Sequence, residues 1–192
     1  MLPADQHVHT QWSADAPHGS MREACVRAVE IGLPAITFTD HADLTTLVVS
    51  DATAEYIRSV GGQVNGDIYR PPPLDADFYL DCVEQCRLQF AGRLQIAAGV
   101  ELGDPHRHPQ AAAALADGGI GLLVGSVHSL RRAGGFAEAA DRYADVPAAE
   151  VVREYLAEVT TLAESSAKFG VLAHINYAAR YWPAAQGALP YC

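Results

Sequence analysis

The sequence predicts an α/β fold built on parallel strands, and two observations lead to this. Short apolar runs of strand character alternate along the chain with longer segments in which apolar residues recur at helical spacing. No repeat, low-complexity tract or convincing domain boundary interrupts this order, and 192 residues suit one domain with a sizeable core. We therefore expect residues 1–192 to form a single domain.

The first two elements are a strand and a helix. Residues 2–9 form the expected first strand, which ends in His-Val-His. Residues 20–32 carry apolar side chains at helical spacing, with charged residues between them. Ser20 is the expected N-cap, Glu23 completes a capping box, and Gly32 ends the helix.

A second strand over 34–39 is followed by the least regular part of the chain. Residues 42–75 are expected to be irregular, with one helical turn near 51–60, because Gly61-Gly62 and Pro71-Pro72-Pro73 mark loop. Loops of this length usually have a function, such as covering a site.

The C-terminal part resumes the alternation of helices and strands. The expected elements are a helix at 75–90, a strand at 94–101, a short Ala-rich helix at 109–117, a strand at 120–128, a loop at 131–146, a helix at 147–169 and a strand at 171–174.

Each of the five expected strands ends in residues of types that bind metals. Because sites in parallel α/β sheets and barrels lie at the carboxyl ends of the strands, these side chains are expected to converge. They are His7 and His9, Asp40 and His41, Glu101, His128, and His174.

This set of side chains suits a divalent metal centre. Imidazole and carboxylate together suit zinc, manganese or iron. His7 and His9 are two apart in a strand and point to one face, and Glu101 could bridge two cations. Paired cations are the usual device for hydrolysing phosphate esters. Asp40 is expected to orient a ligand or to cap the following turn.

Three other histidines lie in loops. We expect His106 and His108, in a proline-flanked loop, to be exposed to solvent. Either Asp15 or His18 could reach a metal, because both follow His9 where the chain leaves the first strand.

Charge and composition limit the partners. A net charge of −10 and a pI near 5.1 argue against a long nucleic acid or an anionic membrane. A small phosphorylated substrate stays compatible, because bound cations would reverse the local sign. No stretch approaches the ~18 apolar residues of a membrane span. The four cysteines without an apolar leader favour reduced thiols and a cytoplasmic protein.

Taken in order, the motifs resemble those of the polymerase and histidinol phosphatase (PHP) family. The resemblance covers nearly the whole chain and implies a distorted seven-stranded β/α barrel with two or three divalent metal ions. The motifs are His7-Val-His9-Thr, Thr39-Asp40-His41-Ala42, Gly99-Val100-Glu101-Leu102, Gly125-Ser126-Val127-His128-Ser129 and Leu172-Ala173-His174.

The resemblance also implies ligands for each metal. The matching residues are His7, His9 and Glu101 for the first metal, Glu101, His128 and His174 for the second, and Asp15 and His41 for the third. Asp15 is preferred over His18 because family members carry His or Asp six residues after the second histidine.

Within the family, the motifs look most like the histidinol-phosphatase branch. This resemblance implies L-histidinol phosphate as the substrate, in histidine biosynthesis. Arg180, shortly after His174-Ile-Asn, matches a basic residue that contacts the substrate phosphate, with Arg131 and Arg132 as lesser candidates. The expected catalytic group is therefore Glu101, His128 and Arg180.

The chain departs from the family at its end. The last family motif, Asp-x-His, has no counterpart here, because the last Asp is Asp145 and the last His is His174. We therefore expect a C-terminally shortened barrel that binds metal, turns over slowly or not at all, and exposes sheet edges that favour oligomers.

Three other functions share part of this sequence pattern. The same fold could act on a nucleotide or sugar phosphate, or be a catalytically impaired metal-binding fragment with a regulatory role. An amidohydrolase-like enzyme acting on C–N bonds is disfavoured, because such enzymes usually use a lysine on a middle strand. The only lysine here is Lys168, late in a helix.

Overall fold

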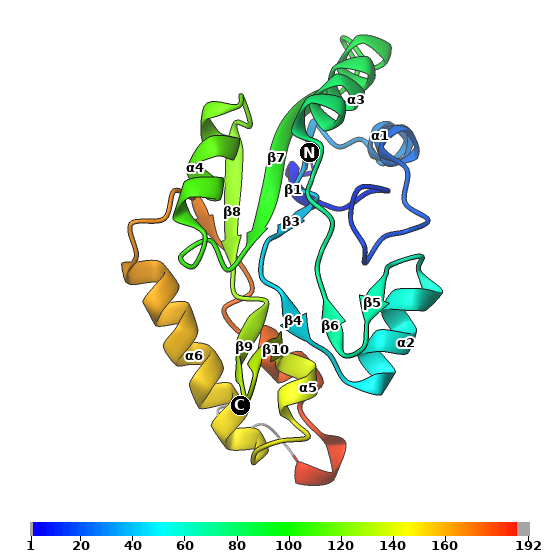
Figure 1. The fold of residues 1–192 in the computed structure, drawn as a ribbon. Coiled ribbons are helices and arrows are strands. Elements are labelled where there is room, and N and C mark those ends of the chain that lie inside the picture. The colour runs from blue at the N-terminus through cyan, green and yellow to red at the C-terminus, as the bar shows by residue number, and fades with distance from the viewer. Residues whose placement is uncertain (1, 188–192) are drawn as a thin grey trace.

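A curled parallel sheet forms the centre of the molecule in the computed structural model, which describes residues 2–187 (Figure 1). The strand order is β1-β2-β7-β8-β11, β3 also pairs with β7, and all of these pairings are parallel. The result is half of a barrel, in agreement with the predicted fold class. The strands are β1 (Asp5–Val8), β2 (Ala35–Phe38), β3 (His41–Asp43), β7 (Gln95–Gly103), β8 (Leu122–Ser126) and β11 (Val171–Leu172).

Four helices pack against this sheet, and three of them lie close to where the sequence predicts them. The fourth, α6, ends at Glu164, five residues before the predicted end at 169. One buried cluster joins α1, α3 and α4 to β2 and β7, and includes Cys25, Phe38 and Val83. A second cluster, with Val151 and Leu162, packs α6 beside the chain that follows β8. The helices are α1 (Met21–Ile31), α3 (Ala76–Gln89), α4 (Pro109–Asp117) and α6 (Ala148–Glu164).

The predicted boundaries of α1 are explained by its caps. The side chain of Ser20 accepts a hydrogen bond from the backbone N–H of Glu23 at 3.3 Å. Gly32 ends the helix in the left-handed conformation, with φ at 78°. A side chain at this position would be strained, which is why glycine is the usual residue there.

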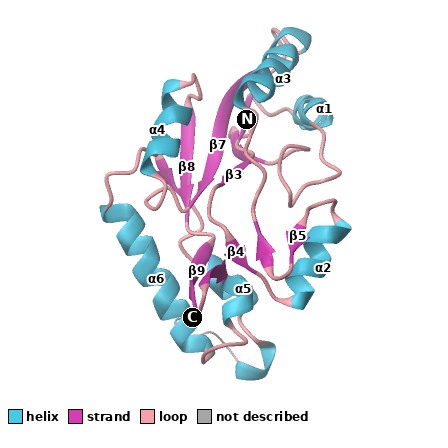
Figure 2. Ribbon diagram, viewed as in Figure 1, coloured by secondary structure: helices cyan, strands magenta, loops and turns pink. Residues whose placement is uncertain are grey.

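The prediction of irregular structure at 42–75 and 131–146 was wrong, since both segments contribute to a second sheet (Figure 2). This sheet has the order β5-β6-β4-β10-β9. Its strands and the helices beside it are β4 (Leu47–Val48), α2 (Asp51–Ser59), β5 (Val64–Asn65), β6 (Ile68–Tyr69), β9 (Ser129–Arg132), β10 (Gly135–Glu138) and α5 (Ala139–Arg142). Strands of two to four residues are too short to show the period-two pattern that predicts a strand.

The two segments are joined by a buried carboxylate. Asp141 accepts hydrogen bonds from the Ser50 backbone N–H at 3.0 Å, and from the hydroxyls of Ser50 and Thr53 at 2.7 Å each. Phe136 of β10 also pairs with Leu47 of β4. These contacts fix α2 against the segment that follows β8.

The register of β2 and β3 on β7 is continuous. Phe38 pairs with Ala98 and His41 pairs with Glu101, so the alignment with β7 is unchanged across the two-residue break between β2 and β3. The backbone N–H of Glu101 donates to the Asp40 carbonyl at 3.0 Å within that break. His41 is therefore placed directly beside Glu101.

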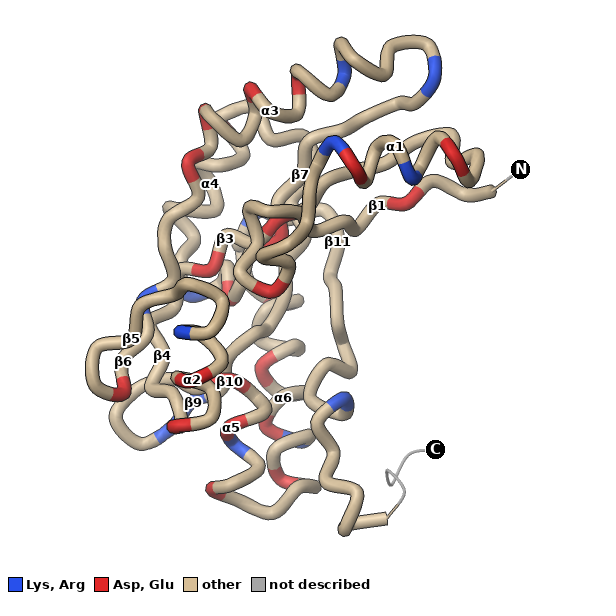
Figure 3. The backbone as a smooth tube through the Cα atoms, turned by 90° about the vertical axis from the view of Figure 1, so that its right-hand side faces the viewer, with Lys and Arg blue, Asp and Glu red and all other residues tan. Residues whose placement is uncertain are grey.

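Four further expectations concern membrane-spanning helices, the cysteines, the distribution of charge and the exposed edge of the sheet. Within residues 2–187, no helix is both long and apolar enough to cross a membrane. Cys25, Cys82 and Cys86 are free thiols, and Cys192 lies outside the described residues. Basic and acidic residues are interspersed over both halves of the molecule in Figure 3. Val171, on the outer strand β11, is 45% exposed.

The C-terminal part of the described chain contains two short 3₁₀ helices, η1 (Tyr177–Tyr181) and η2 (Ala184–Gln186). The first begins three residues after His174, and its residues Ala178 and Ala179 are buried.

Candidate metal centre

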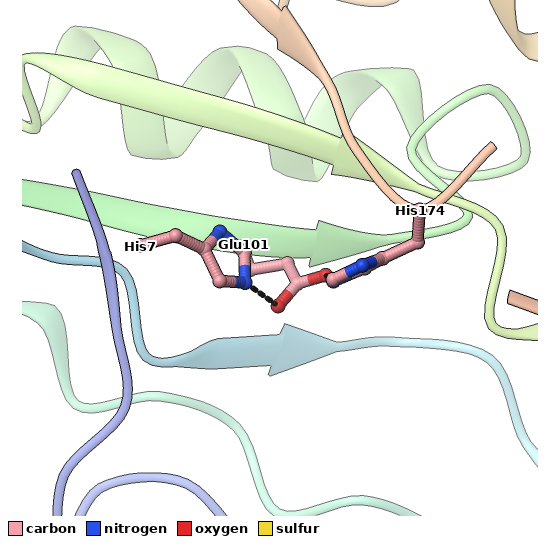
Figure 4. A group of neighbouring side chains, drawn as sticks. All are labelled: His7, Glu101 and His174. Carbon is pink, nitrogen blue, oxygen red and sulfur yellow. Dashed lines mark ion pairs between the residues drawn. The ribbon is translucent and has the colours of Figure 1, made fainter. Parts of the chain in front are cut away.

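Glu101 lies at the centre of the predicted site and is fully buried. Each of its carboxylate oxygens faces the Nε2 atoms of two histidines. Figure 4 shows His7 and His174 approaching this carboxylate from two separate segments of the chain. The Oε2 distances are 3.2 Å to His7 and 2.9 Å to His9, and the Oε1 distances are 3.0 Å to His128 and 3.0 Å to His174.

The elements deliver these side chains in two ways. His7 lies within β1, His41 within β3 and Glu101 within β7. His128 and His174 instead lie two residues beyond the ends of β8 and β11, outside any strand. The φ angle of His174 is 53°, in the left-handed region.

Asp15, rather than His18, joins the cluster. Its Oδ2 lies 3.0 Å from His9 Nδ1 and 3.5 Å from His41 Nε2. His18 is exposed, and it belongs to none of the ligand groups found within residues 2–187.

Asp43 is a neighbour of the cluster that our sequence analysis missed. Its Oδ1 accepts a hydrogen bond from His128 Nδ1 at 2.8 Å, and its Oδ2 lies 3.6 Å from His41 Nδ1. This contact keeps the Nδ1 proton on His128 and turns its Nε2 toward Glu101. A signal was present in the sequence, since His41 and Asp43 have the same two-residue spacing as His7 and His9.

Asp40 holds a loop and belongs to none of the ligand groups of the described chain. It is fully buried, and its Oδ1 accepts hydrogen bonds from the Thr10 backbone N–H at 2.5 Å and the Ser13 hydroxyl at 2.7 Å. The Ser13 hydroxyl in turn accepts from the His41 backbone N–H at 3.0 Å. Asp40 therefore fixes the loop between His9 and Asp15.

The crowding of carboxylates and imidazoles shifts several pKa values. Burial disfavours the charged form of His9, but the carboxylates of Asp15 and Glu101 outweigh it and raise the pKa of His9 to about 10. Burial opposes ionisation of Asp15, yet His41 and His9 hold its pKa well below the ordinary value. Glu101 behaves similarly: despite its burial, His128 and His174 lower its pKa strongly.

The residues fit a divalent cation on geometric grounds. Glu101 Oε2 and His41 Nδ1 are buried atoms without a hydrogen-bond partner in the structure. The Nε2 atoms of His7 and His9 nevertheless lie within 3.2 Å of that oxygen. Nitrogen and oxygen atoms that converge at this distance can surround one cation with bonds of ~2.0–2.2 Å once the imidazoles lose their protons to it.

Three groups of side chains bring their donor atoms within 4.8 Å of one another. All donors are imidazole nitrogens or carboxylate oxygens, which suit zinc, manganese or iron. The groups are His7, Glu101 and His174; His9, Asp15 and His41; and His41, Asp43 and His128.

A cavity of about 1450 Å³ opens onto these side chains. The segment between β3 and α3, expected to be a covering loop, supplies part of its wall with Tyr56, Ile57, Tyr69 and Pro71. Apolar and aromatic groups therefore line the cavity together with the polar cluster.

The three arginine candidates lie in different places. Arg180 is exposed on η1 and lines this cavity, with its guanidinium carbon 5.9 Å from the centre of the Tyr181 ring. Arg131 lines a separate cavity of about 640 Å³. Arg132 pairs with Asp145 at 3.0 Å.

The prediction that His106 and His108 are solvent-exposed was wrong. The His106 side chain is only 6% exposed, and its Nε2 lies 2.6 Å from Glu158 of α6. His108 Nε2 lies 3.1 Å from the Thr45 hydroxyl. Flanking prolines predicted a loop, but they could not show that α6 covers it.

Comparison with known proteins identifies the family of the chain. The PHP domain family matches residues 5–190, so the chain belongs to the PHP domain family. A search of curated proteins gave no match.

Two solved structures are similar to the chain. Histidinol phosphate phosphatase from Lactococcus lactis subsp. lactis Il1403, complexed with zinc, L-histidinol and phosphate, is 22% identical with a TM-score of 0.71, and the match covers 94% of this chain and 60% of that one. A candidate histidinol phosphatase, hisK, from Listeria monocytogenes is 17% identical with a TM-score of 0.66, covering 91% of this chain and 67% of that one. The chain thus spans less than two thirds of the Lactococcus protein. At these identities the likeness establishes the fold.

Proposed function

We propose that residues 1–192 form a single PHP domain that acts as a metal-dependent phosphatase on a small phosphate monoester, with L-histidinol phosphate as its substrate. The observation that carries this proposal is the buried Glu101 carboxylate, which presents one oxygen to His7 and His9 and the other to His128 and His174. Such a carboxylate can hold two cations side by side.

In this proposal the site holds two or three divalent cations, zinc, manganese or iron. When bound, they would polarise the phosphoryl group and activate water for attack on phosphorus. Glu101 fixes the spacing of the ligand groups, and the Asp43 contact orients His128. The proposed ligands are His7, His9 and Glu101 for the first cation, Glu101, His128 and His174 for the second, and Asp15 and His41 for the third.

The proposed substrate fits the surroundings of the centre. Arg180 lines the cavity and would contact the substrate phosphate. Tyr56, Tyr69 and Tyr177 offer aromatic surface to the organic part of a substrate. The net charge of −10 disfavours a long nucleic acid as the substrate. The L-histidinol and phosphate bound by the Lactococcus protein favour histidinol phosphate among small esters.

Metal binding is the first test. The metal-free chain is titrated with Zn²⁺ or Mn²⁺ by calorimetry, beside Glu101→Ala and the control Glu84→Ala, which removes an exposed carboxylate from α3. We expect the wild type and the control to bind metal alike, and Glu101→Ala to lose most of this binding. Equal binding by all three proteins contradicts the proposed centre.

Substrate choice is tested separately by phosphate release from histidinol phosphate, a sugar phosphate and a nucleoside monophosphate. We expect slow, metal-dependent release that is fastest for histidinol phosphate and is abolished by Glu101→Ala. Faster release from another ester would overturn the substrate and leave the metal centre in place. No metal-dependent release from any ester would count against the phosphatase proposal itself.

A further inference from the structure

His128 and His174, the two histidines proposed for the second cation, lie outside the strands of the parallel sheet, and His128 directly precedes β9 of the second sheet. Both lie two residues beyond a strand end, and β11 is only two residues long. His174 also has a left-handed backbone, which is strained for a non-glycine residue and persists only when its surroundings enforce it. Other contacts must therefore fix these two side chains.

One such contact comes from Tyr155 of α6. Tyr155 is almost fully buried, and its hydroxyl donates to the His174 backbone carbonyl at 2.6 Å. The backbone N–H of Tyr177 donates to the same carbonyl at 2.8 Å. The left-handed turn at His174 is therefore fastened to α6 on one side and to η1 on the other.

A second contact starts one turn further along α6. Arg107 pairs with Glu158 and also donates to Asp104 Oδ2 at 3.0 Å. Asp104 is buried with φ at 54°, and its Oδ1 accepts from the His128 backbone N–H at 3.1 Å. The path from Glu158 through Arg107 and Asp104 thus ends on the backbone of His128.

Tyr155 and Glu158 are three residues apart and lie on one face of the helix. Among non-glycine residues of the described chain, only Asp104 and His174 have positive φ, and each is reached from this face. The helix therefore supports both places where the backbone is strained beside the cluster.

We propose that α6 is the positioning element of the second cation site, with Tyr155 setting His174 and Glu158 setting His128 through Arg107 and Asp104. The inference rests on the proposed metal centre. Loss of either support should weaken the second site alone. Groups that act behind a ligand account for about 10–100-fold in metal affinity.

The experiment titrates the metal-free chain with Co²⁺ and follows the visible absorption of the bound ion, which reports its coordination geometry. His128→Ala identifies which binding event belongs to the second site. Tyr155→Phe and Glu158→Gln are then compared with two matched controls. Tyr79→Phe removes an equally buried hydroxyl that donates to the Gly99 carbonyl, and Glu154→Gln breaks another glutamate–arginine pair on α6, with Arg142.

We expect Tyr155→Phe and Glu158→Gln to weaken the event that His128→Ala removes by about tenfold or more. Their Co²⁺ spectrum should change, while the other binding event and both controls stay as in the wild type. Glu158→Asp should recover part of the affinity. Second-site affinity and spectrum in both variants equal to the controls would overturn the inference and leave the metal centre intact. If His128→Ala removes no Co²⁺ binding event that the wild type shows, both the inference about α6 and the proposed metal centre are overturned.

Discussion

The two halves of the candidate centre are built differently. On one side, His7, His41 and Glu101 lie within strands, where backbone pairing such as that of His41 with Glu101 sets their positions, and His9 directly follows β1. On the other side, His128 and His174 lie beyond the ends of β8 and β11. The His128 backbone N–H donates to Asp104, and the Tyr155 hydroxyl donates to the His174 carbonyl. Side-chain positions in the first half follow from the ladder, whereas those in the second depend on tertiary contacts. The second half should therefore be the more sensitive to changes outside the cluster.

The largest effect should come from the residue shared by both halves. Glu101→Gln keeps the shape of the side chain but removes its charge, so binding should fall at every site that uses it. Removing one partner from a buried charge cluster costs about 3–5 kcal/mol, which corresponds to about 10²–10³-fold or more. Calorimetric titration with Zn²⁺ measures this. If only one binding event were lost, Glu101 would not join the halves.

Single histidine variants should separate the two halves. His7→Ala should weaken metal binding at the first site, and His174→Ala should weaken it at the second. Each loss should exceed the roughly 10–100-fold in affinity that is typical when a residue hydrogen-bonded to a ligand is changed. The two proteins are compared by the number and affinity of their Zn²⁺ binding events. Loss of the same event in both variants would show that the ligands are assigned to the wrong cations.

Asp43→Asn tests the side-chain support of the second half. The amide keeps the volume of the side chain, but it accepts the hydrogen bond from the His128 Nδ1–H less strongly than the carboxylate does. We expect about tenfold weaker binding at the second site, with the first site unchanged. Asp117→Asn, which alters an exposed carboxylate paired with Lys168, is the control. Equal metal affinities at the second site in the two variants would show that Asp43 does not support that site.

The smallest expected effect is the pH dependence of stability of the metal-free protein, which comes from His9 in the first half. His9 has its pKa raised to about 10 by neighbouring carboxylates, so its protonated form stabilises the metal-free fold. This stabilisation is complete below the unfolded pKa of about 6.5 and is lost as pH rises toward 10. Because the partner Asp15 is half exposed, we expect only about 1 kcal/mol, or about 2–4 °C in Tm. Melting curves with a chelator at pH 6 and pH 10 measure the difference, which Asp15→Asn should reduce.

The sequence predicted the strand-borne half better than the loop-borne half, for a physical reason. Strand ends, residue types and the two-residue spacing of His7 and His9 are local signals, and the structure brings these residues together as expected. The same two-residue spacing of His41 and Asp43 could also have predicted that Asp43 lies beside the cluster. The support of His128 by Glu158 spans thirty residues and involves no periodic pattern, so only the folded chain reveals it.

The predicted helices were confirmed because each carries a local signal: side-chain caps for α1 and α3, an alanine run after Pro109 for α4, and a long apolar pattern for α6. The second sheet could not be predicted in this way. β4 is two residues long and pairs with Phe136, from a segment far along the chain, so no local pattern marks it. The burial of His106 likewise depends on α6, which no feature near His106 indicates.

The unbroken register of β2 and β3 on β7 limits how this protein can change during evolution. One residue inserted or deleted between Phe38 and His41 would move His41 by ~3.3 Å along β7 and turn its side chain to the opposite face. We therefore expect the length of this stretch to be more strongly constrained than the identity of Thr39. Natural variants should carry substitutions there but no change in length, whereas the turn at Gly66–Asp67 between β5 and β6 should accept insertions.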